Sequence, residues 1–358
     1  MKLAIYGANG YQGKLIVTEA TRSAEVILVG RDAARLREAA ATIGLPEADV
    51  RPAAADDHDA LVAAFREADA VINCAGPFTP TGAAVVRAAI AAGRHYVDTA
   101  GEQSYLKEIF DTFGAAAEAV GVTVVPAAND ACVPADLVAG LLAERLGPLE
   151  EISSIHVITG GGGPSRGSLR SVIESMDLIK AGGLGYDGGA WRVGIPARHT
   201  SIILPGGSEA VPVAKFPLCE VVTIPRHVQV RHVEGLAEAA LSARLSVPLD
   251  PAIIAGLPEG PTEEDRRTQR FTYVIDAVAT DGRHGRGVVQ GPDTYGTTAV
   301  IAVESARRLA ANPAKPGVLA PGQAYDPAGF LDSLLPHGVH WTIEVGGDFG
   351  VASLDVRR

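Results

Sequence analysis

The stretch LAIYGANGYQG (residues 3–13) decides the fold of the first part of the chain. Its apolar first half predicts a buried strand, and Gly7, Gly10 and Gly13 follow at regular spacing before helical periodicity begins. A strand, a glycine turn and a helix in this order are the context of a dinucleotide-binding loop. Gly7 would permit the sharp turn, Gly10 the approach of a pyrophosphate, and Gly13 close packing of the helix. The alternative is a structural turn, because the G-x-x-G-x-x-G spacing is looser than G-x-G-x-x-G.

The first 130 residues alternate between short apolar runs and helical periodicity. Pro52 would remove a ladder donor from one of the predicted strands, which suits the edge of a sheet. Continuous apolar strands separated by helices predict an α/β fold with a doubly wound parallel sheet, a Rossmann domain. Besides the first strand, we predict strands at 25–30, 49–56, 70–76, 95–100 and 122–128, and helices at 34–44, 58–68, 82–93 and 103–121.

The residue pattern changes after about residue 135. A helix at 135–147 leads into a long strand, and segments rich in β-branched and aromatic residues then predict strands at 200–207, 214–224 and 270–280. No helix of comparable length separates most of these segments, which indicates a mixed or antiparallel sheet in an α+β domain. We therefore divide the chain into a Rossmann domain (1–130), a second α+β domain (131–294) and a C-terminal segment (295–358). The helix at 295–311 is expected to return to the first domain.

Composition and charge argue against several classes of protein. The chain has 358 residues and a net charge of −11, unlike a nucleic-acid binder or a polybasic membrane anchor. Cys74, Cys132 and Cys219 form no CxxC pair, so we expect no disulfide framework and a reducing, cytoplasmic location. The first strand begins at Lys2, which leaves no room for a signal peptide, and no apolar run approaches the roughly 20 residues that span a bilayer.

The nine histidines are scattered along the chain. His227 and His232 stand apart in sequence from carboxylate or cysteine partners, whereas zinc sites usually gather such ligands at short spacing. We therefore predict no metal site.

The end of the second strand bears on which nucleotide binds. NAD-binding domains usually place an acidic residue there, about 20 residues on, to hold the ribose 2′-hydroxyl. Here Gly30 leaves space for a 2′-phosphate, and Arg31, with Arg35 four residues later, can bind one. The pattern favours NADP(H). The alternatives are that Asp32 is a displaced ribose-binding acid, or that Asp32 is only a helix N-cap and Arg31 a solvated neighbour.

Ligands of open parallel sheets bind beyond the carboxyl ends of the strands. This rule places segments 73–78, 98–102 and 128–132 around a nicotinamide, with Pro77 and Phe78 as an apolar wall for one face of the ring. The alternative is that 73–78 is only a strand-end loop. The predicted cofactor-binding residues are Gly7, Asn9, Gly10, Tyr11, Gln12, Gly13, Gly30, Arg31, Asp32, Arg35, Cys74, Ala75, Gly76, Pro77, Phe78, Gly101, Glu102 and Asn129.

Hydride transfer requires positioning, exclusion of water and often a proton donor. Candidate donors near the strand ends are Asp98, Glu102, Asp130, Cys132 and Tyr295, of which Asp130, Tyr295 and Asp98 are predicted to be catalytic. Each has a structural alternative, since Asp98 could cap a loop, Asp130 could form an Asx turn and Tyr295 could be a packing residue. Cys132 is more often a buried apolar residue than a nucleophile.

The run GGGGPSRGSLR (160–170) raises a second possibility. Four glycines followed by serines and arginines at a helix start can bind a carboxylate or phosphate. On this interpretation Arg166, Ser168 and Arg170 anchor the substrate near the nicotinamide. The alternative is a turn with a capped helix and exposed arginines.

The motifs together resemble the saccharopine dehydrogenase-like oxidoreductases, closest to the branch that includes trans-acting enoyl reductases. The resemblance covers most of the chain. It implies an N-terminal nucleotide domain, a second α+β domain, a cleft between them and a homodimer through the second domain's sheet. The motifs that carry it are GANGYQGKL (7–15), LVGRDAARL (28–36), AVINCAGPFTPTGAAVVRAAIAAGRHYVDTAGE (70–102), PAANDACVPADLVAG (126–140), GGGGPSRGSLRSVIESM (160–176), GPDTYGTTAVIAVESA (291–306) and GVLAPGQAYDP (317–327).

One departure from this branch concerns the pocket. Where the branch commonly reads G-F-D-S-x-P-S-D-L, this sequence has Asn129 to Leu137; Pro134 and Asp136 match, but the inner aspartate position holds Ala131. Asp130 is one residue away and could substitute for it. This departure from the branch's pattern predicts a reshaped pocket and, accordingly, a different substrate.

The function expected from residues and resemblance together is that of an NADP(H)-dependent reductase. It would transfer hydride to a C=C or C=N bond of a small, biosynthetic metabolite, as an enoyl reductase or an imine reductase. One alternative is a saccharopine-type secondary-amine dehydrogenase, in which Arg166, Arg170, Arg192 and Arg198 would hold the carboxylates of an amino-acid conjugate. Another is a non-catalytic NADP-sensing protein. The expected partner is a small-molecule substrate, with neither nucleic acid nor membrane.

Overall fold

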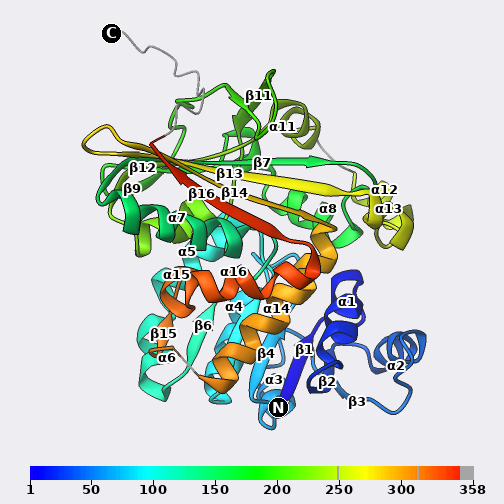
Figure 1. Cartoon of the computed structure of the whole chain (residues 1–358). Coiled ribbons are helices and arrows are strands. Elements are labelled where there is room, and N and C mark those ends of the chain that lie inside the picture. The colour runs from blue at the N-terminus through cyan, green and yellow to red at the C-terminus, as the bar shows by residue number, and fades with distance from the viewer. Residues whose placement is uncertain (248–249, 313, 347–358) are drawn as a thin grey trace.

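Two β-sheets organise the chain, which we describe from a computed structural model covering residues 1–247, 250–312 and 314–346. The N-terminal sheet has seven parallel strands in the order β15-β6-β5-β4-β1-β2-β3. The second sheet has nine strands, with β10-β11-β12-β7-β13-β14-β16 as its main path and β8 and β9 at its side. Figure 1 shows the N-terminal sheet and its helices in the lower half of the view and the second sheet above them.

The N-terminal sheet confirms the predicted doubly wound α/β fold. Its strands are β1 (Lys2–Tyr6), β2 (Glu25–Gly30), β3 (Asp49–Pro52), β4 (Ala70–Asn73), β5 (His95–Asp98), β6 (Thr123–Val125) and β15 (Gly317–Val318). The helices between them are α1 (Tyr11–Ala20), α2 (Ala33–Thr42), α3 (His58–Phe65), α4 (Gly82–Ala91), α5 (Gln103–Thr112) and α6 (Gly114–Val120). The strand that contains Pro52 lies at an edge, as predicted. The single helix expected at 103–121 is instead two helices that meet at Phe113.

Both faces of this sheet are buried, because successive side chains of β1 belong to different cores. Leu3 and Ile5 pack in the core that also holds Ile301 of α14 (Thr294–Ala311). Ala4 and Tyr6 pack on the opposite face, in the core formed with α3, α4 and α5. Helix α14 contacts α1, β4 and β5, so the predicted return of the C-terminal helix to the first domain is confirmed.

The second sheet is mixed, as predicted. Its central strand β7 (Leu149–Thr159) is parallel to β12 (Val230–Glu238) and antiparallel to β13 (Arg270–Ala279). Helix α7 (Cys132–Leu146) leads into it, and β14 (His284–Pro292) follows β13 as a hairpin. The other elements of this half are α8 (Arg166–Glu174), α9 (Met176–Lys180), β8 (Leu184–Asp187), β9 (Ala190–Val193), β10 (Ser201–Ile203), β11 (Ala210–Lys215), α10 (Glu220–Thr223), η1 (Ile224–Arg226), α11 (Ala239–Leu245), α12 (Pro251–Gly256) and α13 (Glu263–Thr268).

The strand predicted at 214–224 is wrong over most of its length. Strand β11 ends at Lys215, and Glu220–Thr223 form the short helix α10. Pro217 has no backbone N–H to donate to a ladder, so the chain leaves the sheet there and turns toward the N-terminal half.

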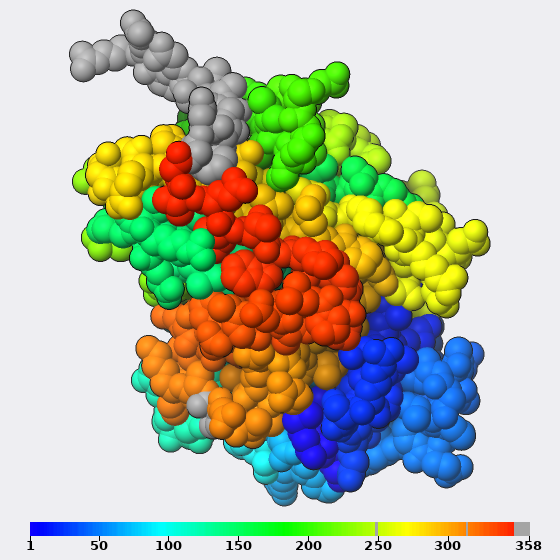
Figure 2. All heavy atoms as spheres, in the orientation of Figure 1, coloured from blue at the N-terminus to red at the C-terminus, as the bar shows by residue number. Residues whose placement is uncertain are grey.

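The C-terminal segment contributes to both sheets. After α14 and β15 come α15 (Pro321–Ala324), α16 (Pro327–Ser333), η2 (Leu335–His337) and β16 (His340–Val345). Strand β16 pairs with β14 in the second sheet, whereas β15 extends the first. Figure 2 shows these orange and red residues spread over both halves of the molecule. Residues 347–358 of the segment lie outside the described residues.

No helix in the described part of the chain combines the length and the apolar character needed to cross a bilayer.

The docking of α7 on the second sheet yields a stability prediction. A Cβ atom at Gly287 of β14 would stand 2.1 Å from Cγ1 of Val138, a fully buried and stiff side chain. We expect Gly287→Ala to lower the free energy of unfolding by about 1–3 kcal/mol through overpacking. Thermal unfolding would measure the loss. Gly114→Ala, whose Cβ would meet no atom within 4 Å, is the matched control and should leave the midpoint unchanged or raise it slightly, because alanine is favoured over glycine in the helix α6.

Candidate cofactor and active-site cleft

A cleft of about 1770 Å³ lies between the two halves of the chain. From the N-terminal half, it is lined by the loops that follow β1, β2, β4, β5 and β6. From the second half, it is lined by β7, the glycine-rich run and α8, and residues near the ends of β13 and α14. This is the position beyond the carboxyl ends of parallel strands at which nucleotides bind.

Two glycines, one in the β1–α1 loop and one in the first turn of α1, stand where no larger residue fits. Gly7 has φ +86°, and a Cβ on it would lie 2.8 Å from Cβ of Ala75. A Cβ on Gly13 would lie 2.2 Å from the Gly7 carbonyl oxygen, so its absence lets α1 pack against the loop. Gly10 is the N-cap of α1 and provides no side-chain cap. The N–H groups of the first turn are therefore available to an anion such as a pyrophosphate.

The β2 end of the cleft carries two exposed arginines. Arg31 and Arg35 both line the cleft, and neither forms an ion pair with any residue in the described ranges. Asp32 is the N-cap of α2, since its Oδ1 accepts hydrogen bonds from the backbone N–H of Ala34 (2.9 Å) and Arg35 (3.1 Å). The carboxylate thus already has a structural task, while the arginines have unpaired donors for a 2′-phosphate.

At the opposite end, Glu102 holds the β4–α4 loop in place. Its Oε1 accepts hydrogen bonds from the Phe78 N–H (2.8 Å) and from Oγ of Ser171 (2.6 Å), and its Oε2 accepts from the Thr79 N–H (2.7 Å) and hydroxyl. Glu102 is 2% exposed. Because Ser171 lies on α8, this one carboxylate ties the loop that carries Pro77 and Phe78 to the second half of the chain. Two of its donors are backbone N–H groups, which cannot turn to accept a proton as hydroxyls can, and this favours a positioning role.

Asp130, one of the three residues predicted to be catalytic, lies in a polar cluster at the cleft. Oδ1 accepts from the Thr298 hydroxyl (2.8 Å) and Oδ2 accepts from the Tyr273 hydroxyl. Burial raises the pKa of the Asp130 carboxyl, and these two hydrogen bonds act in the opposite direction. Burial also raises the pKa of Tyr273 well above its ordinary value, so the phenol keeps its proton.

Three further cleft residues were missed by sequence reasoning, namely His156, Glu220 and Tyr273. Nε2 of His156 lies 2.7 Å from Oε1 of Glu220, and this oxygen accepts a hydrogen bond from the Ser154 hydroxyl at 2.6 Å. The His156 ring lies over Tyr273, with ring centroids 4.1 Å apart. The cluster therefore runs from Glu220 through His156 and Tyr273 to Asp130. No short motif joins residues so far apart in sequence.

Comparison with known proteins bears on the N-terminal half of the chain, which forms one side of this cleft. Residues 3–125 match the family model described as the saccharopine dehydrogenase NADP binding domain. The resemblance stated from the sequence is thereby confirmed for the NADP-binding domain, and so is NADP(H) as its cofactor.

Curated relatives extend the comparison beyond the NADP-binding domain. The chain is 31% identical over 176 residues to a lipid droplet localized protein of Caenorhabditis elegans, which is 46% of this chain and 41% of that protein. It is 33% identical over 141 residues to a trans-acting enoyl reductase of Mycobacterium leprae, 38% of this chain and 34% of that protein. The matches thus span about two-fifths of the relatives' length or less.

Solved structures share the whole fold. A saccharopine dehydrogenase (L-Glu forming) of Saccharomyces cerevisiae superposes over 97% of this chain and 100% of its own, with a TM-score of 0.57 and 14% identity. An amine dehydrogenase of Mycobacterium smegmatis superposes over 91% of this chain and 98% of its own, with a TM-score of 0.50 and 10% identity. At these identities the likeness shows that the NADP-binding domain and the second sheet form a known α/β architecture.

The structure gathers most of the predicted cofactor-binding residues at the cleft. Among the predicted cofactor-binding residues, Gly13 alone does not line the cleft. Its contribution is to the packing of α1. The cleft-lining members are Gly7, Asn9, Gly10, Tyr11, Gln12, Gly30, Arg31, Asp32, Arg35, Cys74, Ala75, Gly76, Pro77, Phe78, Gly101, Glu102 and Asn129. Asn129 also fixes the turn before α7, because its Oδ1 accepts from the backbone N–H groups of Ala131 (3.1 Å) and Cys132 (2.8 Å).

Tyr295 joins three segments at the mouth of the cleft. Its hydroxyl accepts from the Ser165 N–H (2.7 Å) and contacts Oγ of Ser168 (2.9 Å), while its ring meets Tyr11 edge-on at 5.1 Å. Arg166 and Arg170 also line the cleft, and Arg170 is exposed. The predicted substrate residues thus share one wall, in which Ser168 is engaged by Tyr295.

Asp98 and Cys132 do not line the cleft. Asp98 is fully buried and accepts from the N–H groups of Ala100 (3.0 Å) and Ala127 (2.9 Å) and from the Tyr105 hydroxyl (2.7 Å). Burial raises its pKa. This arrangement matches the structural alternative, a loop-capping role. Cys132 is buried in the core, and burial raises the pKa of its thiol well above the ordinary value.

The expectation that His227 and His232 have no carboxylate partners is wrong. Nε2 of His227 lies 3.0 Å from Oδ1 of Asp136, and Nδ1 of His232 lies 3.2 Å from Oδ1 of Asp187. Folding supplies partners that are 91 and 45 residues distant in sequence.

The free arginine at the β2 end yields a prediction on cofactor choice. Arg31→Ala should weaken NADPH binding about 10–100-fold, the effect of removing hydrogen bonds to a charged group, and leave NADH binding nearly unchanged. Fluorescence titration of both nucleotides would measure this. Arg37→Ala, an exposed arginine of α2 outside the cleft lining, is the matched control. Equal losses for both nucleotides in Arg31→Ala would contradict the 2′-phosphate assignment.

Proposed function

We propose that the chain is an NADP(H)-dependent reductase that reduces a C=C or C=N bond of a small, biosynthetic metabolite. The observation that carries this proposal is the polar cluster of Asp130, Tyr273, His156 and Glu220 in the same cleft as the nucleotide loop. NADPH supplies a hydride when it is bound. The protein must then supply a proton to the neighbouring atom and exclude water.

Asp130 is the group that we assign to proton donation. Its burial favours the protonated carboxyl, and Thr298 and Tyr273 fix both of its oxygens. The His156 ring packs on Tyr273 and the Glu220 carboxylate lies beside that ring, so both groups help to hold the Tyr273 phenol against Asp130. Glu102 positions the opposite wall through Phe78.

Relatives named trans-acting enoyl reductase favour the C=C bond as the first substrate class to test. The alternative of a saccharopine-type dehydrogenase relied on four arginines converging on substrate carboxylates. Arg166 and Arg170 do line the cleft, but Arg192 is not among its lining residues and Arg198 pairs with Glu151 elsewhere. A site for two or three carboxylates therefore lacks half of its expected donors.

The direct test is NADPH oxidation by the purified chain with a panel of enoyl compounds and imines. We expect turnover with at least one class, and the class that reacts identifies the bond. Tight NADPH binding with no turnover across the panel would contradict the proposal and favour the NADP-sensing alternative.

The acid role of Asp130 predicts a pH dependence. A proton donor must be protonated, so the reduction rate should fall as pH rises through the raised pKa of Asp130. Asp130→Asn should lower kcat by about 10²–10⁴-fold, the usual contribution of a general acid, and remove this limb of the profile. NADPH affinity serves as the check on folding. Asp59→Asn, an exposed aspartate of α3, is the matched control, and an unchanged profile in Asp130→Asn would assign the proton to another group.

A further inference from the structure

The second sheet carries a group of ionisable side chains on the face that points away from the cleft. Successive residues of a strand point to opposite faces, and Ser154 and His156 of β7 face the cleft side. Glu151 and Ser153 therefore lie on the other face. In the β7–β12 register, His232 is opposite Glu151 and Glu234 is opposite Ser153, so these residues of the two strands share that outer face.

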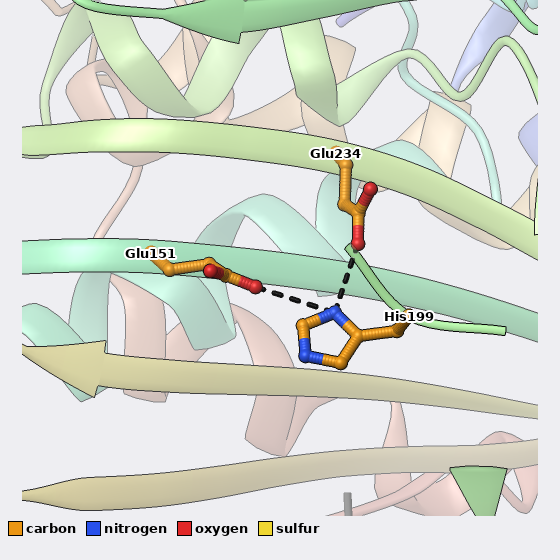
Figure 3. Close-up of side chains that lie close together, drawn as sticks. All are labelled: Glu151, His199 and Glu234. Carbon is orange, nitrogen blue, oxygen red and sulfur yellow. Dashed lines mark hydrogen bonds and ion pairs between the residues drawn. The ribbon is translucent and has the colours of Figure 1, made fainter. Parts of the chain in front are cut away.

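His199 enters this group from the segment that precedes β10. Figure 3 shows its ring between the two carboxylates. Nδ1 of His199 lies 2.9 Å from Oε1 of Glu234, 3.2 Å from Oε1 of Glu151 and 3.1 Å from Oγ of Ser153. A ring nitrogen carries at most one proton, so it can donate to only one of these three oxygens. Three oxygen atoms therefore surround a nitrogen that needs only one hydrogen-bond acceptor.

The spacing of these donors is close to that of a tetrahedral zinc site. Zinc binds nitrogen and carboxylate oxygen at about 2.0–2.2 Å, which places neighbouring donor atoms about 3.3–3.6 Å apart. The separations from His199 to the two carboxylates, 3.2 and 2.9 Å, need to open by only a few tenths of an ångström. One ligand atom from each of the three residues lies within 4.8 Å of the others.

His232 supplies an independent observation. It is 1% exposed, and its Nε2 is buried without a hydrogen-bond partner among the described residues, 4.0 Å from Oε2 of Glu234. Its other ring nitrogen, Nδ1, meets the Asp187 carboxylate at 3.2 Å. A carboxylate on one ring nitrogen and an open second nitrogen is the arrangement of metal-binding histidines. A buried polar atom without a partner is costly, and a metal ion would satisfy it.

Arg198 holds the two carboxylates from the side away from His199. Its Nη1 donates to Oε2 of Glu151 at 2.7 Å, and its backbone N–H donates to Oε2 of Glu234 at 3.1 Å. Each glutamate thus keeps Oε1 turned toward His199 while Oε2 is fixed. Outer partners of this kind orient the carboxylate ligands of metal sites.

We propose that Glu151, His199 and Glu234 form a zinc site on the outer face of the second sheet. His232 would become the fourth ligand by a shift of its ring, because its Nε2 now lies 4.0 Å from Oε2 of Glu234 and outside the group of three. Four protein ligands would close the coordination sphere, as in structural rather than catalytic zinc sites. The ion would fix the segment before β10 to β7 and β12. The apolar core beneath β10 and β11 is small, with Ile155, Ile202, Val213, Leu236 and Val274 as its buried members. A metal cross-link at one end of that core would stabilise the covering segment.

The test uses the full chain, freed of metal by a chelator and titrated with zinc alone. We expect one zinc ion per chain and a higher thermal unfolding midpoint with zinc but not with magnesium. His199→Gln and His232→Gln should each abolish stoichiometric binding, and Asp187→Asn should weaken it about 10–100-fold. His58→Gln, which changes an exposed histidine of α3, is the matched control and should bind zinc as the unaltered chain does.

Folding of the variants is checked by NADPH binding, which depends on the loops of the N-terminal sheet and on none of the proposed zinc ligands. Cobalt substitution of the unaltered chain gives a second readout that needs no variant, because tetrahedral and octahedral cobalt differ in their visible spectra. A tetrahedral spectrum with nitrogen ligands is expected. Absence of zinc binding, unchanged binding in both histidine variants, or an octahedral cobalt spectrum would each overturn the proposal.

Discussion

The close approach of α1 to the β1–α1 loop is the constraint on which the rest of the molecule depends. A single Cβ atom at Gly13 would collide with the Gly7 carbonyl and with Cα of Ala8, and would push α1 off the sheet. Helix α14 packs on α1, and its first turn brings Tyr295 to Tyr11 and Ser165. The same contact that aims the first turn of α1 at the cleft therefore also sets where the second half of the chain sits. Cofactor position and domain arrangement are not independent in this fold.

Glu102 makes the second connection between the halves, at the other end of the cleft. A buried carboxylate is stable only when its lone pairs are satisfied, and here two backbone N–H groups and two hydroxyls satisfy them. Three of these donors belong to the β4–α4 loop and one to α8. The carboxylate thus fixes the loop containing Phe78 relative to a helix of the second half. With Tyr295 at one end and Glu102 at the other, the cleft is held at both of its edges.

Sequence reasoning succeeded where the determinant is local. The glycine turn, the position of Pro52 at a sheet edge and the return of helix 295–311 follow from patterns contained within a few residues. It failed at 214–224, where apolar and β-branched residues suit both a strand and a buried helix, and Pro217 decides between them. It could not assemble His156, Glu220 and Tyr273, because an alternating pattern indicates only that a residue points to one of two faces. Which face meets the cofactor depends on how the sheets are stacked.

The central strand β7 of the second sheet carries polar side chains on both of its faces. A strand with neighbours on both sides normally has apolar faces, since every buried charge must find partners that offset its lost hydration. Here Ser154 and His156 lie against Glu220 on the cleft face, whereas Glu151 and Ser153 meet His199 and Glu234 on the outer face. Two separate polar groups thus share one backbone. Hydrophobic packing alone would be satisfied by valine or isoleucine at these four positions, so their chemistry points to tasks other than stability. The cleft face lies in the proposed active site, and the outer face has the ligand types of the proposed metal site.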